Sequence, residues 1–119
     1  MRVLGLDHVQ LPMAPGGEDL ARGFWTGVLG LPEVRKPASL AGRGGVWFQC
    51  GPQQIHCGVE AELTPGRRHP ALLVDDLDRA REALEKAERP VRHEPEIPGY
   101  RRLFTEDPFG NRVELMERS

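Results

Sequence analysis

The chain has 119 residues, enough for one domain with a substantial core and too few for two ordinary ones. Its composition, 39% hydrophobic and 29% charged, is typical of a globular protein, and a formal net charge of −2 argues against nucleic acid or an anionic membrane as the main partner. We expect a cytoplasmic protein, because no apolar run approaches the roughly 20 residues of a transmembrane helix and no signal-peptide block opens the chain.

Residues 3–59 carry the signals of a strand, a helix and three further strands. In the first strand, over 3–13, His8 and Gln10 alternate with Val9 and Leu11. The helix is expected over 18–29, where Leu20, Phe24, Trp25, Val28 and Leu29 recur at helical spacing. A short strand over 33–36 and a hairpin of 46–50 with 53–59 across Gly51-Pro52 complete this half.

The same order begins again at residue 69. A strand is expected over 69–74, and Asp76 is placed to cap a helix whose apolar stripe is Leu77, Ala80, Leu84 and Ala87. Pro90 should end that helix, a short strand is expected over 91–93, and 101–106 should pair with 112–116 across the Asp107-Pro108-Phe109-Gly110-Asn111 turn. The sequence therefore predicts two βαβββ modules, at about 1–62 and 67–119, in an α+β fold with curved mixed sheets.

Four polar residues occupy matching places in the two modules. His8 and His69 lie in the first strands, and His56 and Glu114 lie in the last strands. His8, His56 and Glu114 alternate with apolar neighbours, so they should line the face that the helices leave uncovered. Three imidazoles and one carboxylate suit Zn²⁺, Ni²⁺, Fe²⁺ or Mn²⁺, and this predicts a divalent metal site.

Other polar and aromatic residues are weaker candidates. The pattern allows Trp47, Phe48, Tyr100, Arg101 and Phe104 as substrate-binding residues. Core packing explains the strand aromatics equally well, and a solvated basic loop is the commoner outcome for Tyr100 and Arg101. His93 lies in a charged loop without a repeat partner and is interpreted as a surface residue. Cys50 and Cys57 are expected to be reduced, with Cys57 on the apolar face beside Ile55.

Several of these segments together resemble the vicinal oxygen chelate superfamily, which includes glyoxalase I, extradiol dioxygenases, bleomycin-resistance proteins and fosfomycin-resistance thiol transferases. The resemblance covers nearly the whole chain. It rests on His8, on Phe24-Trp25 with Val28-Leu29-Gly30-Leu31, on His69 before Val74-Asp75-Asp76-Leu77, and on the stretch from Asp107 to Leu115.

The resemblance implies paired βαβββ modules in a homodimer and metal ligands at His8, His69 and Glu114. It further implies a small oxygenated substrate bound to the metal through two vicinal oxygens, with Glu114 as the catalytic proton-transfer group. Glyoxalase I carries a glutamate where this chain has His56, so Glu114 is left as the one candidate base.

Three functions remain open on this reading. The first is a metal-dependent, glyoxalase-like lyase or isomerase. The second is an Fe²⁺ extradiol-type dioxygenase, in which the imidazole of His56 would fill one open position on the metal. The third is a non-catalytic drug- or metabolite-binding protein of the bleomycin-resistance type, which would need no metal.

Overall fold

The computed structural model describes all 119 residues and divides the chain into two compact units, residues 1–63 and 64–119. None of its helices is both long enough and apolar enough to span a bilayer. Neither Cys50 nor Cys57 forms a disulfide, and Cys57 is fully buried.

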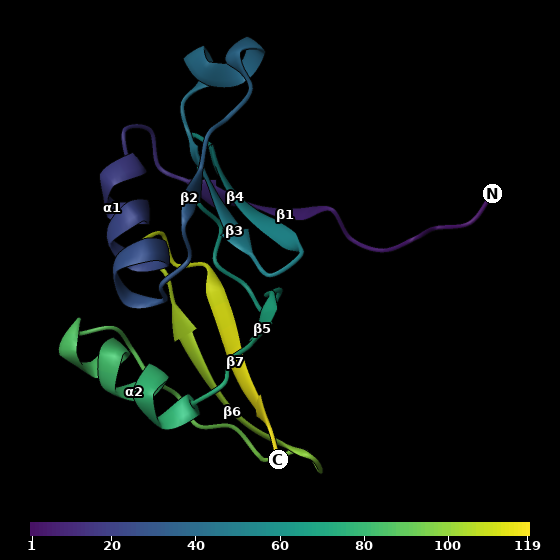
Figure 1. Cartoon of the computed structure of the whole chain (residues 1–119). Helices are drawn as coiled ribbons and strands as arrows, with labels where there is room; N and C mark the ends of the chain where they lie inside the picture. Colours follow the sequence, from purple (N-terminus) through teal and green to yellow (C-terminus); the bar gives the residue numbers. More distant parts are fainter. The chain divides into compact units, whose positions relative to one another are not determined.

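The first unit is a four-stranded sheet with α1 and η1 on one side and the η2 segment beyond the end of the strands (Figure 1). The strand order is β1-β4-β3-β2, with β1 parallel to β4 and the other neighbours antiparallel. Its elements are β1 (His8–Met13), α1 (Glu18–Arg22), the π-helix η1 (Gly23–Val28), β2 (Glu33–Val34), the 3-10 helix η2 (Ala38–Arg43), β3 (Val46–Cys50) and β4 (Gln53–Val59).

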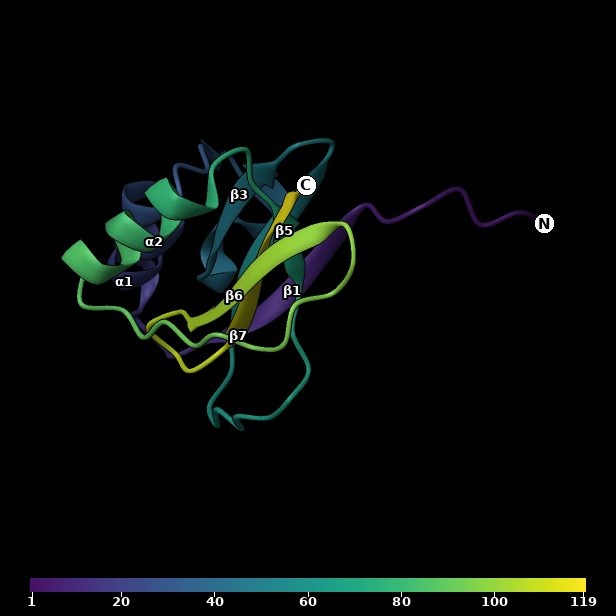
Figure 2. The same cartoon turned by 90° about the horizontal axis from the view of Figure 1, so that it is seen from below.

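The second unit repeats this plan in a smaller form. The order is β5-β7-β6, with β5 parallel to β7, and α2 packs on β6 and β7 (Figure 2). Its elements are β5 (Ala71–Leu73), α2 (Leu77–Lys86), β6 (Tyr100–Glu106) and β7 (Arg112–Arg118). The strand predicted over 91–93 is reduced to a single bridge between Arg92 and Phe104. The α+β class with two curved mixed sheets is confirmed.

The strand registers show that the two halves are equivalent. In the first unit Gln10 pairs with His56, and His8 lies two residues before Gln10. In the second unit Ala71 pairs with Glu114, and His69 lies two residues before Ala71. The strand expected over 69–74 is shortened to β5, so His69 lies just before it, whereas His8 is the first residue of β1. Each of these two histidines nevertheless stands in the same register relation to the candidate ligand of the last strand.

The alternation predicted for the last strands is confirmed by burial. Val113 and Leu115 of β7 are fully buried with Leu103 of β6, and Ile55 and Cys57 are buried on β4. Residues of opposite parity occupy the other faces of these sheets. Glu114 is among them and is nevertheless only 6% exposed, so this carboxylate is not a solvated surface group.

The first helix differs from the prediction. Its α-helical part ends at Arg22, and the next six residues form a π-helix in which Leu29 N donates to Phe24 O. Gly23 and Gly27 lower the helix propensity of this segment, so tertiary packing can impose the wider turn. The π-helix lets both Phe24 and Trp25 be buried, whereas Leu20 is 61% exposed and its assignment to the apolar stripe was wrong.

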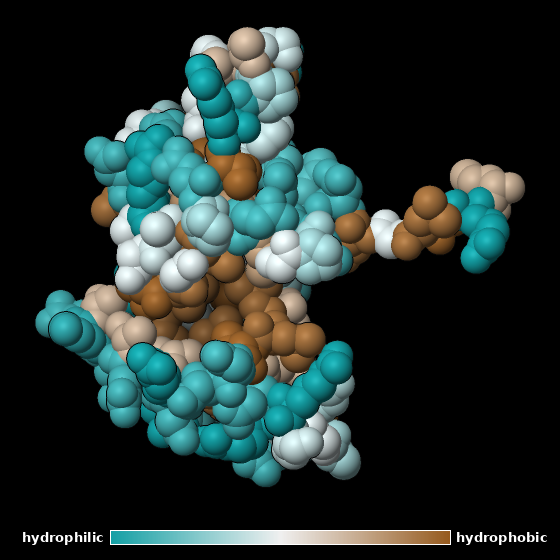
Figure 3. Space-filling model, in the orientation of Figure 1, coloured by the Kyte–Doolittle hydropathy of each residue, from teal (hydrophilic) through white to brown (hydrophobic).

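The first strand begins at His8 and not at residue 3. β4 begins at Gln53, and its pairing with β1 begins at His8 with Gln54, so the preceding residues have no neighbouring strand to pair with. Residues 1–7 instead extend away from the unit, and the hydrophobic Val3, Leu4 and Leu6 are exposed (Figures 1 and 3).

The second helix begins where it was predicted to begin but ends before Pro90. Asp76 Oδ1 accepts a hydrogen bond from Arg79 N at 3.1 Å, which confirms the predicted N-cap. Leu77 and Leu84 are buried, but the helix ends at Lys86. Glu88 adopts a left-handed conformation with φ 57°, and Arg89 N donates to Leu84 O, so the chain leaves the helix before Pro90.

The Asp107–Asn111 turn is organised by the side chain of Asp107. Its Oδ1 accepts hydrogen bonds from Phe109 N and Asn111 N, both at 2.9 Å, and its Oδ2 accepts one from Asn111 Nδ2. Gly110 completes the turn with φ 81°, a conformation that favours glycine. Asp107 is 1% exposed, so the turn that sets the β6–β7 register depends on a buried carboxylate.

We therefore predict that Asp107→Ala lowers the free energy of unfolding by about 3 kcal/mol, because it leaves buried backbone N–H groups without an acceptor. Urea unfolding followed by circular dichroism measures this loss. The exposed Asp75→Ala removes the same charge and should cost less than about 0.5 kcal/mol. Equal losses in the two variants would contradict the role assigned to Asp107.

Candidate metal site

His56 is buried between two aromatic rings on the uncovered face of the first sheet. Its ring stacks on Trp47 with centroids 3.7 Å apart and on His8 with centroids 4.0 Å apart. Trp47 is its direct partner on β3, so the strand register produces the first of these stacks. His56 is only 4% exposed. Burial, followed by the neighbouring His8, lowers the pKa of His56, whereas Asp7 acts weakly in the opposite direction.

A chain of amides determines which nitrogen of His56 carries the proton. Gln49 Nε2 donates to the carbonyl oxygens of Gly51 and Gln53, so Gln49 Oε1 is left as an acceptor. Gln54 Nε2 donates to that oxygen at 3.1 Å, which turns Gln54 Oε1 toward His56 Nε2 at 2.8 Å. His56 must therefore donate through Nε2, and its Nδ1 keeps a lone pair.

His8 and His69 show the same division of roles. His8 Nδ1 lies 2.9 Å from Asp7 Oδ2, and His69 Nδ1 lies 2.7 Å from Arg67 O. Both oxygens only accept, so Nδ1 carries the proton in each ring and Nε2 keeps the lone pair when the ring is neutral. Metal-binding histidines usually donate their second N–H in this way, which orients the ring and fixes its tautomer.

The second unit brings a histidine and a carboxylate into direct contact. His69 Nε2 lies 3.0 Å from Glu114 Oε1, although these residues are far apart in sequence. If His69 is neutral, the lone pair of Nε2 faces a carboxylate oxygen that also carries lone pairs. Two acceptors at this distance need a positive charge between them, either a proton on Nε2 or a metal cation.

The separation of these two atoms also suits a metal. Two ligands about 2.1 Å from one ion and at right angles to each other lie about 3.0 Å apart. The observed distance of 3.0 Å agrees with this value. The distance is therefore compatible with two ligands of one divalent cation as well as with a hydrogen-bonded ion pair.

Arg102 and Phe104 surround the Glu114 carboxylate. Arg102 Nη1 lies 3.3 Å from Glu114 Oε2, while Arg102 Nε and Nη2 donate to Pro95 O. Phe104 is the direct partner of Glu114 on β6, and its ring meets His69 edge-on at 5.0 Å. The buried carboxylate is thus held by a cation on one oxygen and by His69 on the other, so its orientation is restricted.

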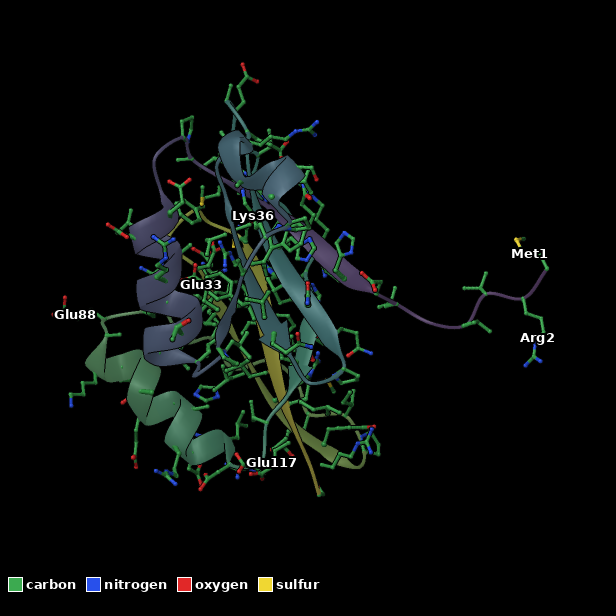
Figure 4. All side chains as sticks on the ribbon, turned by 45° about the horizontal axis from the view of Figure 1, so that its top comes forward. Met1, Arg2, Glu33, Lys36, Glu88 and Glu117 are labelled. Carbon is green, nitrogen blue, oxygen red and sulfur yellow. The ribbon has the colours of Figure 1, made fainter.

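The five substrate-binding candidates fall on different faces. Trp47 and Phe104 lie beside His56 and Glu114, respectively, and Tyr100 shares the parity of Phe104 on β6. Phe48 is fully buried on the opposite face and stacks against Trp25, so it is a core residue. Arg101 also faces away from Glu114 and forms ion pairs with Asp78 and Glu117, of which Figure 4 labels Glu117.

Arg102 was missing from the predicted site residues. Period-two alternation from Phe104 places Arg102, and not Arg101, on the face of Glu114, so the signal was present in the sequence. The Gln49–Gln54 chain that sets the tautomer of His56 could not be found in this way, because it depends on the amide orientations across the hairpin.

Each unit contributes two of the four predicted ligands. His8 and His56 belong to the first unit, and His69 and Glu114 belong to the second. Neither unit alone brings together three or more histidine, cysteine or acidic side chains in a metal-binding cluster. A metal site that uses all four ligands must therefore combine a His8–His56 pair with a His69–Glu114 pair.

We predict that His56 titrates below the ordinary histidine value of 6.5 and stays neutral at pH 7. Because the folded pKa is the lower one, the unfolded chain binds the proton first, and the stability due to His56 is complete above 6.5 and decreases as pH falls below it. Histidine NMR titration measures the midpoint, and urea unfolding at several pH values measures the stability. His56→Gln should flatten this pH dependence and His93→Gln should not; a midpoint above 6.5 would contradict the assignment.

Comparison with known proteins agrees with this fold. A family model described as the Glyoxalase/Bleomycin resistance protein/Dioxygenase superfamily matches residues 5–115. A crystal structure from Bacillus anthracis, of a protein assigned to the glyoxalase family, is 42% identical, with a TM-score of 0.93 and 100% coverage of both chains. No curated protein matches the chain.

Two further structures represent named relatives. A lactoylglutathione lyase from Agrobacterium tumefaciens is 25% identical, with a TM-score of 0.76 and coverage of 98% of this chain and 95% of that one. The E126Q mutant of the fosfomycin resistance protein FosX from Listeria monocytogenes, solved with Mn(II) and 1S,2S-dihydroxypropylphosphonic acid, has a TM-score of 0.84 at 15% identity and covers 99% and 95% of the two chains. On the family match and the Bacillus relative, the chain belongs to the Glyoxalase/Bleomycin resistance protein/Dioxygenase superfamily.

Proposed function

We propose that His8, His56, His69 and Glu114 together bind one divalent metal ion and that the protein is a metal-dependent, glyoxalase-like enzyme. Its substrate would be a small molecule that presents two vicinal oxygens to the ion. The observation that carries the proposal is the contact between His69 Nε2 and Glu114 Oε1, which lie 3.0 Å apart, a separation that one divalent ion bound to both atoms would also produce.

The three imidazoles support the same proposal. Each histidine has one ring nitrogen committed to an oxygen acceptor and one nitrogen with a lone pair. Burial keeps His56 in the neutral form that a metal requires, because its pKa is lowered. Nitrogen and carboxylate donors suit Zn²⁺, Ni²⁺, Fe²⁺ and Mn²⁺. The FosX relative was solved with Mn(II), which is consistent with this class of ion.

The chain's own residues would then have distinct roles. The bound ion would supply Lewis-acid stabilisation of negative charge on a substrate oxygen. Glu114 would accept and return a proton through the acceptor capacity that its oxygens retain beside the contact with Arg102. Arg102 would hold the carboxylate in one orientation, and Trp47 and Phe104 would exclude water from the two halves of the site.

We predict that metal-free protein binds one Zn²⁺, Ni²⁺ or Mn²⁺ ion per chain in calorimetric titrations. His8→Ala and His69→Ala should weaken binding about 100-fold or more, whereas His56→Ala should be milder because water can replace one ligand. Glu114→Gln keeps the shape of the side chain but removes its charge and basicity, so turnover should be lost while the protein stays folded.

The matched controls lie close to these residues. His93→Ala removes a histidine from an exposed loop, and Glu117→Gln makes the same change as Glu114→Gln on the opposite face of β7. Both should bind metal as wild type does. Wild-type affinity in all four ligand variants would refute the metal site and favour a non-catalytic binding protein. Selective Fe²⁺ binding with dioxygen uptake would instead favour the dioxygenase.

The proposal also makes a prediction about assembly. A first-unit pair and a second-unit pair must meet, and the homodimer expected from the sequence would allow such pairs to form. Sedimentation at micromolar concentration should therefore give about twice the 13.3 kDa of one chain. A 13.3 kDa species that nevertheless binds one ion per chain would show that one chain is sufficient.

A further inference from the structure

The first unit contains a pocket that the metal proposal does not use. It has a volume of about 310 Å³, at the lower end of the range for small-molecule sites. Gln10, Trp47 and Gly58 line it from the sheet, and Lys36, Leu40 and Arg43 line it from the segment around η2. The side chain of Gln10 lies over Gly58, where an added Cβ would come within 2.6 Å of Gln10 Nε2.

Two cations that form no direct ion pair line this pocket. Lys36 donates to the carbonyl oxygen of Gly44 and forms no ion pair, and Arg43 forms neither an ion pair nor a hydrogen bond (Figure 4 labels Lys36). Glu18 is the nearby acid: its Oε2 accepts a hydrogen bond from Gly45 N at 2.9 Å, and Lys36 attracts its charge only at longer range, without an ion pair. The pocket therefore offers two positive charges, an amide and an aromatic ring to a ligand.

The segment that carries Arg43 is held at its base. Gly44 and Gly45 both have positive φ, and a Cβ at Gly45 would lie 2.4 Å from the backbone oxygen of Cys57. Only glycine allows this close approach to β4. With Lys36 bound to Gly44 and Glu18 bound to Gly45, the base of the η2 segment is held in place, so Arg43 directly precedes an anchored turn.

The pocket shares two residues with the surroundings of His56. Trp47 lines the pocket and also stacks on the His56 ring at 3.7 Å. Gln10 lines it and is the partner of His56 across β1 and β4. A ligand in the pocket would therefore lie next to the residues that support one of the proposed metal ligands, on the same face of the sheet.

We propose that this pocket binds an anionic group of the substrate, a carboxylate or a phosphate monoester attached to a small apolar body. Arg43 and Lys36 would bind the anion, and Leu40 and Trp47 would contact the apolar part. This inference rests on the proposed function for calling the ligand a substrate. The anion site itself needs no metal and can be tested separately.

The test uses ligand-observed NMR on chelator-treated protein with three probes: benzoate, phenyl phosphate and the neutral benzamide. At least one anion should bind about tenfold or more tightly than benzamide, because charge-assisted hydrogen bonds are the stronger kind. The preferred anion identifies the carboxylate or the phosphate. Arg43→Gln should weaken binding of that anion about tenfold, whereas the neighbouring Arg35→Gln removes the same charge outside the pocket and should not.

The outcomes separate this site from the metal site. Arg43→Gln should keep wild-type metal affinity, and His69→Ala should keep wild-type anion affinity in the metal-free protein. The inference is overturned if neither anion binds, if benzamide binds as tightly as both, or if Arg43→Gln and Arg35→Gln behave alike. Failure of metal binding alone would leave the anion result unchanged.

Discussion

The parallel pairing of the first and last strands is the constraint on which both halves of the candidate site depend. The hairpins β3–β4 and β6–β7 are local, but neither could place a second ligand beside His56 or Glu114. β1 and β5 do so by pairing with β4 and β7 from far away in sequence. A shift of one residue in either parallel register would turn the first-strand histidine to the apolar face.

Two turns keep the hairpin registers in place, one exposed and one built on a buried carboxylate. The Gly51-Pro52 turn is held partly by Gln49, whose amide donates to Gly51 O and Gln53 O. The Asp107 turn instead buries a carboxylate and satisfies it with backbone and side-chain donors from Phe109 and Asn111. In the first hairpin, the polar side chain that closes the turn is Gln49, which lies in β3. In the second hairpin, it is Asp107, which directly follows β6. The ligand is carried on the returning strand.

Much of this organisation could be predicted from local patterns. The 46–50 and 53–59 hairpin, the Asp76 cap and the alternation around Glu114 follow from turn chemistry and period two, which act over a few residues. The predictions were wrong where contacts between residues far apart in sequence determine the boundaries and the buried face of an element. Leu20 is exposed although Phe24 and Trp25 of the following π-helix are buried, and residues 1–7 lie outside the sheet because β4 begins only at Gln53. For Phe48 and Arg101 the strands were predicted correctly, but strand alternation places both side chains on the faces opposite His56 and Glu114.

The two halves differ chemically although their geometry is equivalent. In the first unit, His56 is surrounded by Trp47, His8 and Gln54, and burial favours its neutral form. In the second unit, the equivalent position is Glu114, whose negative charge is shared by His69 and Arg102. Removing Arg102 would leave the buried carboxylate in contact with His69 alone. The proton or metal ion between these two groups would then be the one positive charge that offsets the desolvation of Glu114. The arginine thus offsets part of the cost of burying the Glu114 carboxylate, with or without a metal ion.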